Sequence, residues 1–256
     1  MTKVTAIIQA RMGSTRLPGK VLKEIQGKPI LWHIIHRTKA SKLIDEIIVA
    51  TTTNVEDKKI MELTNSLGVR SFRGCEQDVL DRYYQAAKKF KADVIVRITA
   101  DDPFKDPGVI DEVISIFLNN GDNLDYASNT IDPTYPEGID VEVFSFTALE
   151  CAWTEASSKF EREHVTPYIW RNTEKFKVKN VINKSGNLSN LRWTLDTEED
   201  LSFITEVYNK LYTEDKVFLM EDVLILLAQH PEISKINENV ERRACLKVSS
   251  KPKVVS

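Results

Sequence analysis

Short β-branched runs alternate with helix-length segments through the first half of the chain, and this alternation limits the possible folds more than any other feature. It predicts strands over residues 4–9, 46–52, 69–74 and 93–99, and helices over 29–39, 54–67, 78–90 and 109–119. Asn54 and Asp57 are expected at the N-cap of the second of these helices. Strands separated by single helices pair in parallel, and helices cover both faces of their sheet. We therefore expect an α/β protein with a doubly wound, mostly parallel sheet.

The pattern changes beyond residue 125. Strands are expected over 138–146, in "FKVKNVI" and in "NLRWTL", with helices over 147–157, 161–171 and 197–212. We interpret this part as an antiparallel excursion that returns to the main sheet. The predicted organisation is one domain over residues 1–212 with a small antiparallel accessory lobe within about 125–185, a helical extension over 213–245, and a polar, disordered tail over 246–256.

Composition excludes several classes of partner. The 256 residues carry a formal net charge of -3, so no overall positive field attracts nucleic acid or an anionic membrane. Cys75, Cys151 and Cys245 lie far apart and form no C-x-x-C pair, which argues against disulfides and structural zinc and indicates a reducing cytoplasm. Arg11 interrupts the apolar N-terminus, so no secretory signal is expected, and no apolar stretch approaches the ~20 residues that span a membrane. Because the overall charge is slightly negative, any anion site must be local.

A cationic loop, "ARMGSTRLPGK", follows the first predicted strand. Parallel sheets bind ligands at the carboxyl ends of their strands, so the loop is well placed to be a binding site. It is not a P-loop, because five residues rather than four separate Gly13 from Gly19, and because Lys20 is followed by Val21. Pro18 also removes a backbone N–H. An anion would instead be held by Arg11, Arg16 and Lys20, with donors from Ser14 and Thr15.

The alternative for this loop is a surface turn with solvated cations. Against it, like charges ~4 Å apart repel by about 1 kcal/mol in water and about 4 kcal/mol near a protein surface. A compact loop that gathers three cations is therefore more stable when an anion neutralises them.

Carboxylates follow two other predicted strands. "TADDPF" places Asp101 and Asp102 after the apolar strand over 93–99, although Asp-Asp-Pro is also ordinary turn chemistry. Asp196 follows "LRWTL", although with Glu199 it could form the N-cap and capping box of the next helix. A cationic loop combined with strand-end carboxylates suits Mg²⁺, which is bound by one or two carboxylates, waters and substrate phosphates. Together these residues predict a Mg²⁺-nucleotide site.

Asp140 and Glu142 alternate along a predicted strand, so their side chains share one face. This face either lines a pocket or is a solvated edge, and the sequence leaves both possibilities open.

The stretch "IIQARMGSTRLPGKVL" resembles the N-terminal signature of the CMP-sugar synthetases, roughly P-A-R-x-x-S-x-R-L-P-G-K. This family contains the acylneuraminate and 3-deoxy-manno-octulosonate cytidylyltransferases. The stretches that resemble its spore-coat-polysaccharide, SpsF-like branch are "EIIVATT", "FRGCEQDVLDRYYQAA", "VRITADDP", "PEGIDVEVFSFTALE", "REHVTPYI" and "LRWTLDTEEDL". The similarity covers about residues 4–208. It implies a Rossmann-like, three-layer nucleotidyltransferase fold of the GT-A type, with a mixed, mostly parallel sheet, and a possible homodimer.

The resemblance also implies roles for individual residues. Arg11, Ser14, Arg16 and Lys20 match triphosphate-binding positions, and Asp81-Arg82 resembles a D-R pair near the nucleotide. Asp101 and Asp196 match the two metal-binding aspartates of G-D-E-P and V-D-T-P-E-D-L-E. The implied catalytic residues are Arg11, Arg16, Lys20 and Asp101, and the implied nucleotide-binding residues are Gln9, Ala10, Arg11, Gly13, Ser14, Arg16, Lys20, Asp81, Arg82 and Thr99.

The implied reaction is attack by a sugar-acid hydroxyl on the α-phosphorus of CTP, which gives a CMP-sugar and pyrophosphate with Mg²⁺ as cofactor. The chain departs from the family pattern at Gln9, Ala100 and Asp102. These departures remove no phosphate or metal ligand, but they leave the identity of the acceptor open. Asp140, Glu142, Arg162 and His164 are the acceptor-site candidates. Two alternatives are a glycosyltransferase that uses a nucleotide sugar and a non-catalytic nucleotide-binding module.

Overall fold

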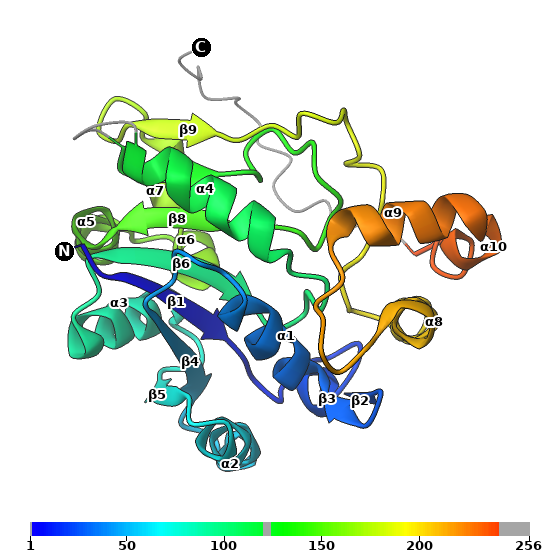
Figure 1. The fold of residues 1–256 in the computed structure, drawn as a ribbon. Helices are drawn as coiled ribbons and strands as arrows, with labels where there is room; N and C mark the ends of the chain where they lie inside the picture. The colour runs from blue at the N-terminus through cyan, green and yellow to red at the C-terminus, as the bar shows by residue number, and fades with distance from the viewer. Residues whose placement is uncertain (1, 120–123, 241–256) are drawn as a thin grey trace.

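A seven-stranded sheet forms the centre of the protein in a computed structural model that describes residues 2–119 and 124–240 (Figure 1). The strand order is β5-β4-β1-β6-β8-β7-β9. The strands are β1 (Val4–Gln9), β4 (Glu46–Thr52), β5 (Arg70–Gly74), β6 (Val94–Thr99), β7 (Tyr126–Ser128), β8 (Glu142–Ser145) and β9 (Val178–Asn180). All neighbouring pairs are parallel except that β8 runs antiparallel to both β6 and β7. The mixed, mostly parallel sheet is therefore confirmed.

Helices cover both faces of this sheet. They are α1 (Ile30–Lys39), α2 (Lys58–Ser66), α3 (Val79–Phe90), α4 (Pro107–Asn119), α5 (Phe146–Glu155), α6 (Lys159–His164), α7 (Pro167–Arg171), α8 (Glu198–Leu211), α9 (Met220–Gln229) and α10 (Pro231–Ser234), with two 3-10 helices, η1 (Lys20–Leu22) and η2 (Val55–Asp57). Along β1 the side chains alternate between two apolar cores: Ala6 and Ile8 face the core that contains α1, α4, α8 and α9, and Ile7 faces the core that contains α3, α5 and α7. The alternation explains why the apolar run is continuous.

The second half of the chain differs from the sequence prediction in three places. The antiparallel pairing expected within 125–185 occurs inside the main sheet, at β8. A separate antiparallel ribbon lies in the first half of the chain, where β2 (Glu24–Ile25) pairs with β3 (Lys28–Pro29). The run "NLRWTL" is not a strand; it pairs only through a bridge between Glu137 and Arg192. The helix expected over 161–171 is divided into α6 and α7, because Val165 has a φ of 73° and Pro167 begins the second helix.

Asn54 and Asp57 occupy the N-cap positions of η2 and α2, close to where the sequence predicted a cap, but neither side chain makes a capping hydrogen bond. The Asp57 carboxylate instead accepts hydrogen bonds from the Met12 N–H at 2.7 Å and from the Thr52 side chain. Asp57 thus fastens the loop after β1 to the end of β4.

The helices α9 and α10 lie within the predicted C-terminal extension. The domain boundaries at residues 212 and 245 stay predictions, and Cys245 and the tail expected over 246–256 lie outside the described residues. Within the described parts of the chain, no helix combines the length and apolar character needed to cross a bilayer.

Candidate active site

The loop after β1 folds back on itself so that its cations reach the carboxyl edge of the sheet. Met12 stands at its base, where its carbonyl accepts the N–H groups of Ser14 at 2.9 Å and Gly19 at 3.1 Å. Gly19 has a φ of 67°, a left-handed conformation that favours glycine, and it leads directly into η1, which begins with Lys20. Leu17 is buried and anchors the loop in the core. The loop is therefore a built structure rather than a solvated turn.

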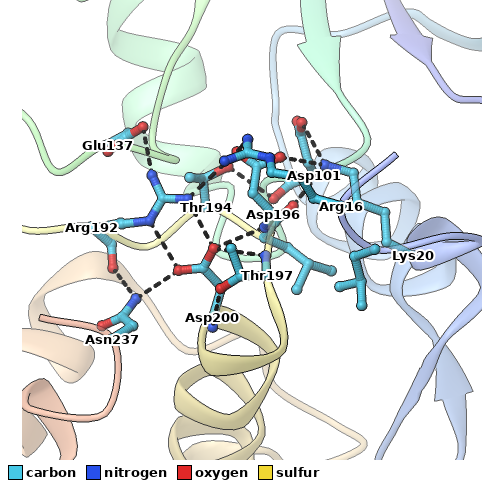
Figure 2. A network of polar contacts seen from close by, with 12 residues as sticks. Arg16, Lys20, Asp101, Glu137, Arg192, Thr194, Asp196, Thr197, Asp200 and Asn237 are labelled. Carbon is cyan, nitrogen blue, oxygen red and sulfur yellow. Dashed lines mark hydrogen bonds and ion pairs between the residues drawn. The ribbon is translucent and has the colours of Figure 1, made fainter. Parts of the chain in front are cut away.

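Lys20 contacts both predicted metal-binding aspartates (Figure 2). Its Nζ donates to Asp101 Oδ2 at 3.1 Å, to Asp196 Oδ1 at 2.9 Å and to the Leu195 carbonyl at 2.7 Å. Burial lowers the pKa of Lys20, but the attraction of Asp101 and Asp196 outweighs it and the pKa lies above its ordinary value. Burial raises the pKa of Asp101, but Lys20, with smaller contributions from Thr99 and Lys105, outweighs this effect and holds the pKa below its ordinary value. The lysine and both predicted metal-binding aspartates are thus brought into direct contact.

Asp196 is available to this site because another pair caps the following helix. The N-cap of α8 is Thr197, whose hydroxyl accepts the Asp200 N–H at 3.2 Å. The Asp200 carboxylate, at N3, accepts the Thr197 N–H and so completes a capping box. The capping box expected from Asp196 and Glu199 is therefore wrong. Asp196 instead points toward the loop, where Arg16 Nη2 lies 2.8 Å from its Oδ2.

These groups open onto a cleft of about 550 Å³. Of the predicted site residues, it is lined by Gln9, Ala10, Arg11, Gly13, Ser14, Lys20, Arg82, Thr99, Asp101, Asp140, His164 and Asp196. Buried Gln9 Oε1, Arg82 Nε and Arg97 Nε, all from lining residues, have no hydrogen-bond partner among the described residues. Buried polar atoms are rarely left unsatisfied, so this wall of the cleft suits a polar ligand.

The acidic side of the cleft contains a buried ion pair. Lys105 is fully buried, and its Nζ lies 2.8 Å from Asp102 Oδ2 and also donates to the Asp140 carbonyl. The Thr99 hydroxyl donates to the same Asp102 oxygen at 2.6 Å. Burial, with a contribution from Asp102, raises the pKa of Asp140 to about 7. Asp140 therefore changes its charge near neutral pH.

Four predicted site residues do not line this cleft. Arg16 reaches it only through Asp196, and Asp81 accepts hydrogen bonds from Trp153 Nε1 at 2.9 Å and Gln85 Nε2 at 3.1 Å. Glu142 is buried and is paired with Arg97 and hydrogen-bonded to Tyr126 and Thr166. Arg162 forms a bidentate pair with Asp78, with Nη2 at 2.6 Å from Oδ2.

The structure adds lining residues that the sequence did not single out. They include Glu76, Gln77, Arg97, Glu137, Lys159 and Thr194. Arg97 carried a signal that could have identified it, because a cation within the apolar strand "DVIVRIT" requires a buried partner or a ligand. The others, including Thr194 in the predicted strand "NLRWTL", carried no such signal.

The donor set fits a magnesium site that substrate oxygens complete. Asp101 and Asp196 both contact one nitrogen, so their carboxylates converge on a point now taken by the Lys20 ammonium. Among residues 2–119 and 124–240, no group of three or more His, Cys, Asp or Glu side chains is placed to hold a metal ion. Two carboxylates alone suit Mg²⁺, which keeps waters and takes phosphate oxygens as further ligands.

Comparison with known proteins agrees with this geometry. A family model described as cytidylyltransferase matches residues 5–229. An uncharacterized protein of Methanocaldococcus jannaschii is 42% identical over 247 residues, which cover 94% of this chain and 97% of that protein. The spore coat polysaccharide biosynthesis protein SpsF of Bacillus subtilis is 32% identical over 244 residues, covering 93% of this chain and 99% of that protein.

A solved structure shows the same architecture. The cytidylyltransferase from Leptospira borgpetersenii serovar Hardjo-bovis superimposes with a TM-score of 0.88 at 34% identity, covering 94% of this chain and all of that one.

Proposed function

The chain belongs to the cytidylyltransferase family and is a CTP-dependent nucleotidyltransferase, and on this premise we propose that it joins CMP to a sugar acid in a Mg²⁺-dependent reaction. A hydroxyl oxygen of the acceptor forms a bond to the α-phosphorus, the bond between that phosphorus and the bridging oxygen to the β-phosphate breaks, and the hydroxyl proton is released. The products are a CMP-sugar and pyrophosphate. The similarity to a spore coat polysaccharide protein supports a role in surface polysaccharide synthesis.

The convergence of Asp101 and Asp196 on Lys20 carries this proposal. Asp101 and Asp196 would hold the metal ion. Bound Mg²⁺ would supply positive charge that polarises the α-phosphate and lowers the pKa of the attacking hydroxyl. Lys20 supplies a donor where negative charge grows on the departing pyrophosphate, and preorganised donors of this kind stabilise a transition state most effectively. Arg16, which does not line the cleft, contributes through its ion pair with Asp196.

The acceptor is expected on the side of the cleft that α6 borders. His164 and Lys159 line it and can pair with a carboxylate, and Asp140 can accept a hydrogen bond from a sugar hydroxyl. Glu142 and Arg162 would act indirectly, by holding Arg97 and Asp78 in place. A homodimer and a cytoplasmic location stay predictions.

The test is pyrophosphate release measured with each nucleoside triphosphate in turn, with and without Mg²⁺, in the presence of nonulosonic and related sugar acids. We expect release only with CTP, Mg²⁺ and an acceptor, and complete loss in EDTA. Equal rates with ATP or GTP would contradict the cytidylyl assignment. Release of a nucleoside diphosphate from a nucleotide sugar would instead identify a glycosyltransferase.

A further inference from the structure

A polar network centred on Arg192 lies beside Asp196, on the side away from Lys20 (Figure 2). Arg192 Nε donates to Asp200 Oδ1 at 2.9 Å, and its Nη2 donates to Asp200 Oδ2 at 2.8 Å. The same guanidinium reaches Glu137 Oε1 at 3.1 Å through Nη1, and Asp196 Oδ2 lies 3.5 Å from Nη2. Arg192 therefore connects two residues that line the cleft, Asp196 and Glu137, to a third carboxylate that does not.

Asp200 has no capacity left for a metal or a substrate. It is fully buried, and besides the Arg192 fork it accepts the backbone N–H groups of Asp196 at 2.9 Å and Thr197 at 3.1 Å. Asp200 is thus a charged anchor for the backbone at Asp196.

Asn237 closes the network from the C-terminal segment. It follows α10 and is buried, and its Nδ2 donates to the Arg192 carbonyl at 3.1 Å and to Asp200 Oδ1 at 3.0 Å. One amide therefore fixes both the backbone of Arg192 and the carboxylate that Arg192 pairs with. These contacts tie the C-terminal segment to the active-site edge across 37 residues of chain.

We propose that Arg192 is a positioning residue of the nucleotidyl-transfer site and that Asn237 extends this role to the C-terminal segment. Two carboxylates four residues apart, Asp196 and Asp200, repel each other at short range in a buried environment. Arg192 neutralises Asp200 through a bidentate fork, which leaves the Asp196 carboxylate in a fixed orientation toward the loop and the metal position. Groups that orient a metal ligand in this way contribute strongly to metal affinity.

The first experiment needs no ligand, so it is independent of the proposed function. Hydrogen exchange is followed in the peptide covering residues 192–200 for the wild-type protein, N237A, and the matched control N172A. Asn172 also donates its amide to a backbone carbonyl, that of Tyr168, but lies at the end of α7. We expect faster exchange in this peptide with N237A and unchanged exchange with N172A. Unchanged exchange with N237A overturns the role of the C-terminal segment.

The second experiment rests on the proposed function and measures Mg²⁺ dependence. R192K keeps the charge but loses the planar fork, and R192Q loses both. For variants that melt near the wild-type temperature, we expect the Mg²⁺ concentration for half-maximal rate and the Mg²⁺-dependent part of the calorimetric CTP affinity to weaken about 10- to 100-fold. CTP affinity in EDTA should stay unchanged, which a general loss of structure would not produce.

Folded R192K and R192Q proteins with wild-type Mg²⁺ dependence would overturn the positioning role of Arg192. If the wild-type protein neither binds CTP nor releases pyrophosphate, the proposed function fails. The exchange result then still decides whether Asn237 holds the segment that contains Asp196.

Discussion

The Nζ atom of Lys20 lies 2.9 Å from Oδ1 of Asp196, a residue 176 positions later in the chain. This contact joins the loop after β1 to the segment before α8 and forms one side of the cleft. The Lys20 ammonium lies where the Asp101 and Asp196 carboxylates converge. Its positive charge is therefore already in place at the point where a triphosphate and a metal ion would bind. Each member of this arrangement can be tested separately.

Lys20→Met should lower the rate of pyrophosphate release about 10²- to 10³-fold, because one preorganised donor to the growing negative charge is lost. The matched control is Lys23→Met. Lys23 lies just after η1, and its ion pair with Glu198, at 3.2 Å, is exposed, so its loss should leave the rate unchanged. A Lys20→Met protein that retains the wild-type rate would remove Lys20 from the catalytic residues.

The neighbours Asp101 and Asp102 should give opposite results. Asp101→Asn should abolish most activity with little change in stability, since Lys20 keeps Asp196 and the Leu195 carbonyl as partners. Asp102→Asn leaves the buried Lys105 ammonium without its carboxylate and should lower the free energy of unfolding by about 3–5 kcal/mol. Urea unfolding and initial rates, measured on both proteins, separate these outcomes. Equal losses of stability in the two variants would contradict the assignment of Asp101 to activity and Asp102 to stability.

Asp140→Asn should stabilise the protein at pH 8. Burial raises the pKa of Asp140 to about 7, far above the value of an aspartate in an unfolded chain. For a carboxyl with a raised pKa, the stability it contributes is complete at pH values below its unfolded pKa and is lost as pH rises through 7. The free energy of unfolding should therefore rise at pH 8 but not at pH 4, with the exposed Asp215→Asn as control. If Asp140 contacts the acceptor, the KM for the acceptor should increase in the same variant.

His33 should make the fold acid-sensitive. Its Nε2 contacts the Ile25 carbonyl at 2.8 Å, and burial lowers its pKa from 6.5 to about 4. The unfolded chain therefore binds a proton more readily, so the stability that neutral His33 provides is present above pH 6.5 and is lost as pH falls toward 4. The loss amounts to about 3 kcal/mol. His33→Gln should show a smaller decrease in the free energy of unfolding between pH 7 and pH 4 than the wild-type protein, whereas the half-buried His230→Gln should not.

The strands of the parallel half were predictable because their signals are local. The strand β1 has the predicted bounds, Val4–Gln9, and β4 also begins and ends where the apolar run does. Parallel strands end at one edge of a sheet, so the loop at Lys20 and the carboxylate of Asp101 could be placed together before any distance was known. The identity of the cations and carboxylates at that edge was determined by the sequence alone.

Side-chain contacts, several of them between distant segments, decided the rest. Asp196 lines the cleft because Thr197 and Asp200 cap α8 in its place, and the chain pattern allows either arrangement. The residues of "LRWTL" look like a strand, but Arg192 is held by Asp200 and by Asn237, which is 45 residues further on. Burial and partners brought from distant segments set the orientation of these side chains, and neither is encoded in local periodicity. The sequence therefore determined the sheet and the chemistry of its edge, and only the tertiary structure decided which carboxylate faces the cleft and which one anchors it.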